Sequence, residues 1–201
     1  MRTVTVEQIF DFGLFSLSEH VRNLAEPYTE WSAFDLLTLV GVPLDIRLCA
    51  VLREELLQPL LLHEFACRRV EAVLNTMDTP DERITQGIRL KRRWMAGEVT
   101  ANELSIAQDV ISKVVRSSAD SLILNLPHYV RTMYSAVWVS MDQSAEKAAW
   151  GVARDTVLTY AYKAVPAGAT QLAWHIAREA AWARHFDALV NLMLENKEWD
   201  N

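Results

Sequence analysis

The chain has 201 residues, about half of them apolar, and a formal net charge of −6. This length suffices for a compact domain with a real hydrophobic core, and the six glycines and six prolines are few enough for most of it to be ordered. The acidic balance argues against a nucleic-acid binder driven by phosphate contacts, and no uncharged apolar run reaches the roughly 18 residues that span a bilayer.

Helix start and stop signals divide the first half of the chain into short segments. Residues 1–15 are expected to form a short helix or a packing arm, and Ser18 is a candidate N-cap for a helix that ends before Pro27. Ser32 and Asp35 begin a short helix over 34–40, which Gly41 closes. Further turn and cap signals predict helices over 44–57, 59–75, 80–96 and 101–117.

The segment 122–141 is less regular. Several apolar residues keep helical spacing, and Pro127 suits a helix start, although 137–139 would also tolerate a strand. Asp142 or Ser144 then caps a further helix. Because nothing alternates convincingly with period two, we predict an all-α fold, a compact bundle of roughly eight to ten helices. It would form a single domain over 1–201, with 1–97 and 98–201 as alternative sub-halves.

The C-terminal part repeats itself. The segment 149–155, Ala-Trp-Gly-Val-Ala-Arg-Asp, is echoed by 173–179 and, in shortened form, by 181–184. The four-residue spacing of Trp and Arg would allow a cation–π contact, and the alanines would let helices approach closely. We interpret the repeat as a packing pattern.

Pro166, Ala167 and Gly168 interrupt this region, which predicts a C-terminal antiparallel helical hairpin. Residues whose numbers sum to about 333 should then lie opposite one another, such as Trp150 and Ala183. On a helical wheel, Arg154 and Glu179 both fall on apolar faces and obey the same sum. We therefore predict a partly buried Arg154–Glu179 ion pair with a structural role.

The densest basic run is Arg89-Leu90-Lys91-Arg92-Arg93, followed by Trp94. It lies in a basic stretch, since 65–93 holds 7 basic and 4 acidic side chains, net +3. The wheel turns Arg89, Arg92 and Arg93 away from the expected core. This ridge is either a solvated face or a docking surface for an acidic protein or a phosphate-bearing ligand. The predicted binding residues are Arg89, Lys91, Arg92, Arg93 and Trp94.

Signals for catalysis are weak. His63 and Cys67 have the spacing of two zinc ligands on a helix, but no third ligand is recognisable. His175 and Glu179 could form a helical half-site, although the repeat already explains Glu179. No nucleophile elbow, phosphate-binding loop or EF-hand motif occurs. We therefore expect no metal, no cofactor and no enzymatic activity, with a metal-dependent enzyme as an alternative.

The two cysteines, Cys49 and Cys67, lie among apolar neighbours and form no CxxC pair, as is typical of buried free thiols in a cytosolic protein. The N-terminus has no signal-peptide pattern. We expect a soluble, cytoplasmic protein that does not interact with membranes.

Three blocks, within 43–56, 62–71 and 88–100, resemble short helical proteins of phages and bacteria whose function is uncharacterised. Members of that group continue into runs of Ala, Trp, Arg and Asp, and 148–184 looks like a degenerate form. The organisation is also similar to immunity proteins of bacterial toxin systems. The resemblance implies a small accessory protein of a phage or mobile element.

These observations together favour a non-enzymatic inhibitor or adaptor that binds another protein, from the host or a competing element. A homo-oligomer stays open, and nucleic acid is a less favoured partner. The alternative is a phosphate- or nucleic-acid-linked role through the basic ridge 89–93.

Overall fold

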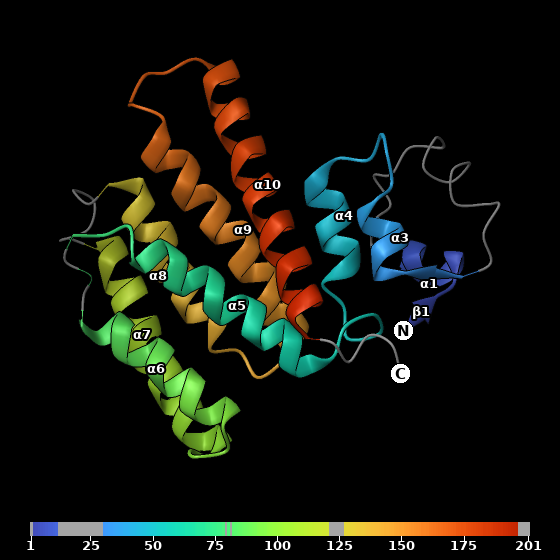
Figure 1. Cartoon of the computed structure of the whole chain (residues 1–201). Helices are drawn as coiled ribbons and strands as arrows, with labels where there is room; N and C mark the ends of the chain where they lie inside the picture. Colours follow the sequence, from blue (N-terminus) through green and yellow to red (C-terminus); the bar gives the residue numbers. More distant parts are fainter. Residues whose placement is uncertain (1, 12–29, 79, 81, 121–126, 197–201) are drawn as a thin grey trace.

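The computed structural model describes residues 2–11, 30–78, 80, 82–120 and 127–196. Within these ranges the fold is all-α, with one two-residue antiparallel strand pair (Figure 1). The elements are β1 (Thr3–Val4), α1 (Val6–Asp11), β2 (Trp31–Ser32), α3 (Ala33–Leu37), α4 (Leu44–Val51), α5 (Pro59–Leu74), α6 (Glu82–Met95), α7 (Ala101–Asp120), α8 (His128–Ser140), α9 (Ala145–Ala164) and α10 (Gln171–Glu195). No helix in these ranges is long and apolar enough to cross a membrane.

Several predicted helix starts are confirmed by their capping hydrogen bonds. Ser32 and Asp35 form a capping box at α3. Thr100 and Glu103 form the same arrangement at α7, where the Glu103 backbone N–H donates to Thr100 Oγ1 at 3.2 Å. Ser144 caps α9. These signals are local, so they depend on few other parts of the chain.

Other boundaries differ from the predictions. The helix expected to reach residue 57 ends at Val51, where α4 gives way to turns that bury Leu52, Leu56 and Leu57. The segment 128–140 is a helix preceded by Pro127, not a strand. The helix predicted after Ser18 lies outside the described residues.

Two clusters of buried apolar side chains form the core. One joins the N-terminal elements to α4, α9, α10 and the first half of α5. The other joins the second half of α5 to α6, α7, α8 and α9. Figure 1 shows α5 and α9 crossing the middle of the molecule. Since each cluster draws residues from both sides of residue 97, the clusters do not coincide with the sub-halves 1–97 and 98–201.

Helices α9 and α10 are joined by a short turn in which Gly168 has φ +85°. Tyr162 contacts Trp174 near this turn, with ring centroids 4.5 Å apart. Farther from it, Trp150 stacks on Trp182, with centroids 5.7 Å apart. The second contact lies earlier in α9 and later in α10, so the two helices run in opposite directions. The predicted partner of Trp150 was Ala183, and the residue that it contacts is the adjacent Trp182.

Close helix crossings occur at two glycines. A Cβ atom added to Gly151 of α9 would lie 2.2 Å from Val139 Cγ1 of α8. One added to Gly87 of α6 would lie 2.4 Å from Ile111 Cδ1 of α7. Gly151, a small residue of the repeat, thus allows α9 to pack closely against α8.

His185 is fully buried between α5, α9 and α10. Its Nδ1 lies 2.7 Å from the Ala181 carbonyl oxygen, which can only accept, so Nδ1 carries a proton. Nε2 lies 2.6 Å from Thr156 Oγ1, whose one proton is shared between this nitrogen and the Val152 carbonyl oxygen, 2.7 Å away. Burial, followed by the positive charge of Arg69, lowers the pKa of His185 to about 3. The ring is therefore neutral in the folded protein.

This burial predicts acid destabilisation. As the pH falls from 6.5 toward 3, the unfolded chain protonates His185 while the folded chain does not, so the free energy of unfolding decreases. His63, whose pKa burial lowers to about 4, acts in the same direction. Between pH 7 and pH 4, the free energy of unfolding measured with urea should fall less for His185→Phe than for the wild type. His175→Gln replaces an exposed histidine and should follow the wild type; parallel curves for all three proteins would contradict the assignment.

Candidate functional site

The predicted basic ridge does not form a continuous charged surface. Lys91 is completely buried. Its Nζ donates to the Asp142 carbonyl oxygen at 2.7 Å and lies 4.0 Å from the centroid of the Trp94 ring. Burial lowers the pKa of Lys91 to about 8. Lys91 therefore joins α6 to the α8–α9 connection and is not available to a partner.

Arg92 is also occupied within the chain. It forms ion pairs with Glu64 and Glu71 of α5, and both Nε and Nη2 donate to the Glu71 carboxylate at 2.8 Å. The Glu71 hydrogen bonds raise the pKa of Arg92 above its usual value. This bidentate pair holds α6 against α5.

Trp94 is half-buried. Its ring meets the His63 ring edge-on, with centroids 5.0 Å apart, and its face receives Lys91. These contacts use the ring for packing, so Trp94 is not a free aromatic surface.

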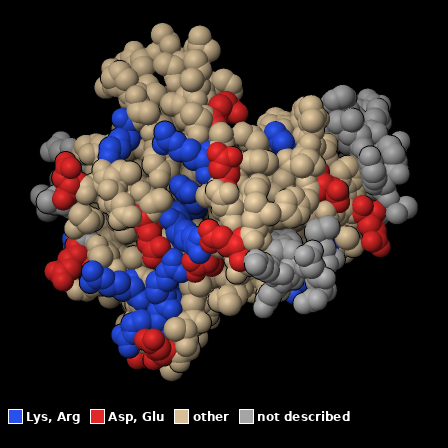
Figure 2. Space-filling model, viewed as in Figure 1, with Lys and Arg blue, Asp and Glu red and all other residues tan. Residues whose placement is uncertain are grey.

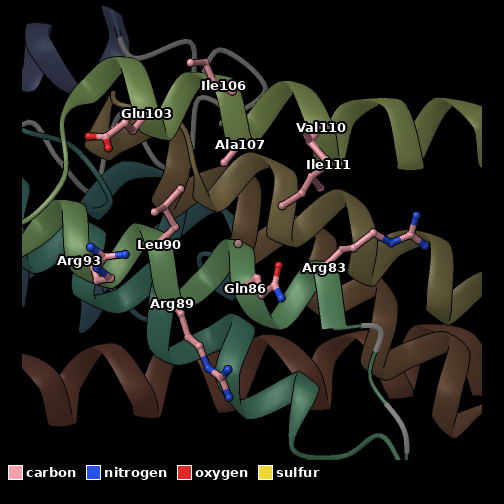
Figure 3. A pocket seen from close by; sticks show the side chains of 11 residues that line it. Arg83, Gln86, Arg89, Leu90, Arg93, Glu103, Ile106, Ala107, Val110 and Ile111 are labelled. Atoms are coloured by element: carbon pink, nitrogen blue, oxygen red, sulfur yellow. The ribbon is translucent and has the colours of Figure 1, made fainter.

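Arg89 and Arg93 remain exposed, and they belong to a groove between α6 and α7. We call it the α6–α7 groove; its volume is about 560 Å³. The lining residues are Arg83, Gln86, Gly87, Arg89, Leu90, Arg93, Glu103, Ile106, Ala107, Val110 and Ile111. Figure 3 shows Leu90 pointing toward α7, while Arg89 points away from α7.

The apolar side of this groove comes from α7. Leu104 and Ile111 are buried in the core, but Ile106 and Val110 are 57% and 50% exposed. Ile106 and Val110 lie one helical turn apart and form a second apolar stripe along α7. At the other side, Arg93 Nε forms an ion pair with Glu98 Oε2 at 3.2 Å. The groove therefore combines exposed aliphatic side chains with arginines.

Arg89 and Arg93 were predicted from the sequence as binding residues, whereas Ile106 and Val110 were not. The signal was present, because apolar residues at 104, 107 and 111 already supply one face of α7 and those at 106 and 110 lie outside it. A helix with more apolar positions than its packed face needs is a candidate for a second contact.

The Arg154–Glu179 ion pair is not formed in the described part of the chain. Arg154 Nε pairs with Asp155 Oδ1 of its own helix at 2.8 Å, and its side chain is 57% exposed. Glu179 is exposed on α10. The helical wheel placed Arg154 on the apolar face of its helix, which was wrong. Helix α9 is buried on nearly all sides, and Arg154 lies on the narrow stripe that faces solvent.

The residues of the alternative metal site are not brought together. His63 and Cys67 are buried on α5, whereas His175 and Glu179 are exposed on α10. The Cys67 thiol lies 3.6 Å from Met95 Sδ, and burial raises its pKa to about 12. Among the residues that the structure describes, no three His, Cys, Asp or Glu side chains are grouped to hold a metal ion.

Charge is unevenly distributed over the surface. Figure 2 shows Lys and Arg side chains in a band that runs from the α9–α10 hairpin across α5 to α6, with acidic side chains beside its middle and lower parts. The free end of the hairpin carries little charge in the same view.

Comparisons of the chain with protein-family models, with curated proteins and with solved structures gave no match.

Proposed function

We propose that the chain is a non-enzymatic inhibitor or adaptor that binds another protein through the α6–α7 groove. The observation that carries this proposal is the exposed pair Ile106 and Val110 beside the arginines of α6. Contiguous exposed apolar side chains with a polar rim are typical of binding surfaces.

The chemistry of the groove supports one class of partner. Two parallel features, an apolar stripe and a basic rim, complement an amphipathic helix that carries aliphatic side chains on one face and carboxylates beside them. Arginine suits the carboxylates because it can donate two hydrogen bonds at once. The partner is therefore an acidic amphipathic helix of another protein.

The resemblance to phage and bacterial accessory proteins supports a partner in the bacterial host or in a competing mobile element. An inhibitor of this kind acts by occupying a surface and needs no catalytic group. A phosphate-linked role through the run 89–93 is less well supported, because Lys91 is buried and Arg92 is paired.

The proposal predicts that removing either feature of the groove weakens binding. The tagged protein is used to capture partners from nuclease-treated bacterial lysate, and the captured protein is then titrated with purified variants. Arg89→Gln/Arg93→Gln and Ile106→Gln/Val110→Gln should each raise Kd at least about tenfold. Only the arginine variant should lose most of the salt dependence of binding.

Lys147→Gln is the matched control, since Lys147 is an exposed cation on α9 that does not line the groove. It should bind like the wild type. A captured protein that binds the wild type and both groove variants equally well would refute the assignment of the groove.

A further inference from the structure

Two arginines from different helices meet at one tyrosine, Tyr160 of α9. Arg69 Nη2 of α5 donates to Tyr160 Oη of α9 at 3.4 Å. The guanidinium carbon of Arg184, from α10, lies 5.3 Å from the centroid of the same ring. Arg69 is half-buried, whereas Arg184 is exposed, so the cluster opens to solvent on the α10 side.

The charge of this cluster is not balanced within the described ranges, where no carboxylate forms an ion pair with Arg69 or Arg184. The neighbouring arginines are paired: Arg68 with Glu64 and Glu195, and Arg92 with Glu64 and Glu71. The Nε of Arg69 is buried and has no hydrogen-bond partner.

The side chains in direct contact with this cluster include a second positive charge. Burial and the nearby Arg184 both lower the pKa of Arg69, and burial is the larger cause. His185 lies on the inner side, with its ring centroid 6.3 Å from that of Tyr160, and it is held neutral. Two like charges held together in this way cost free energy unless an anion offsets them.

We propose that Arg69, Tyr160 and Arg184 form a binding site for a phosphate group. Two guanidinium groups offer several N–H donors to phosphate oxygens, and the phenol adds an O–H donor. A phosphate dianion would neutralise both arginines. The site lies on α5, α9 and α10, none of which lines the α6–α7 groove, so it does not depend on the proposed function.

Inorganic phosphate is the probe for this site. Its binding is measured by isothermal titration calorimetry and by the rise in Tm, with sodium chloride at matched ionic strength as the reference. The wild type should bind phosphate saturably, and its Tm should rise above that in chloride. Arg184→Gln should weaken binding at least about tenfold while retaining the fold, because Arg184 is exposed.

Two further variants separate the site from general electrostatics. Tyr160→Phe keeps the ring and removes the O–H donor, so it should weaken phosphate binding less than Arg184→Gln. Lys147→Gln removes an exposed cation elsewhere on α9 and should bind phosphate like the wild type. Equal phosphate responses in the wild type and Arg184→Gln, or equal effects of phosphate and chloride, would overturn the proposal. Tighter binding of phenyl phosphate than of inorganic phosphate would identify a phosphate monoester as the ligand.

Discussion

Gly151→Ala is expected to destabilise the protein by about 2 kcal/mol, although alanine in place of glycine within a helix ordinarily stabilises by about 0.5–1 kcal/mol. The new methyl group would lie 2.2 Å from Cγ1 and 3.3 Å from Cβ of Val139. Val139 is β-branched and therefore has little rotamer freedom in a helix. The backbones of α8 and α9 must then separate, which loosens the most closely packed helix pair of the core. Urea unfolding measures this change.

A double mutant tests the cause of that loss. Val139→Ala removes Cγ1 and Cγ2, and with them the 2.2 Å contact, while Cβ stays. The double mutant Gly151→Ala/Val139→Ala should therefore be more stable than the sum of the two single changes predicts, by at least about 1 kcal/mol. Gly87→Ala is a matched control, because its one close contact, at 2.4 Å, is with the flexible end of Ile111, while Met141 Sδ and Val137 Cγ1 lie at ordinary contact distances of 3.4 and 3.6 Å. It should cost less than Gly151→Ala. Additive single changes, or a stabilising Gly151→Ala, would contradict the close crossing.

Lys91 should give the protein an unusual gain of stability at alkaline pH. The folded pKa is about 8 and the unfolded value is 10.5, so between these pH values the unfolded chain binds a proton that the folded chain has released. The free energy of unfolding therefore rises with pH through this window, by up to about 3 kcal/mol for this residue alone. Below pH 8 Lys91 is charged in both states, so the free energy of unfolding is lowered by the full cost of burying that charge.

The comparison with Lys91→Met isolates this contribution. Methionine has a similar shape and does not titrate, so the difference in stability between wild type and Lys91→Met should move in favour of the wild type from pH 8 to pH 10.5. Other groups near the site, including Cys67 and Arg92, are present in both proteins. Lys147→Met, which replaces an exposed lysine, should show no such trend. Parallel pH curves for wild type and Lys91→Met would show that Lys91 is not buried as a charge.

The sequence predicted features that depend on local chemistry. The caps at Ser32, Thr100 and Ser144 were recognisable because each bonds to backbone groups only three residues away. The end of α4 was missed, since Leu52, Leu56 and Leu57 are buried by turns and not by a continued helix. That choice depends on contacts with other parts of the chain.

The candidate site was predicted in part, for a related reason. Lys91 has the helical spacing of the inward residues Ile84, Ile88 and Met95, so periodicity alone would have buried it. Its charge led to its assignment to the ridge. The sequence does not reveal the two contacts that stabilise the buried ammonium group of Lys91. These are the hydrogen bond to the Asp142 carbonyl oxygen and the contact with the face of the Trp94 ring. Arg89 and Arg93 needed no such partner and remained exposed.

The central position of α5 and α9 has a consequence for how the chain folds. Their packing joins residues distant in sequence, as in the contact between Arg69 and Tyr160, which are 91 positions apart. Both core clusters require these two helices, so neither cluster can be completed from neighbouring helices alone. Closing such a long loop costs entropy before the contacts form. The chain should therefore fold more slowly than helical bundles built from sequential hairpins, where contacts are mostly local.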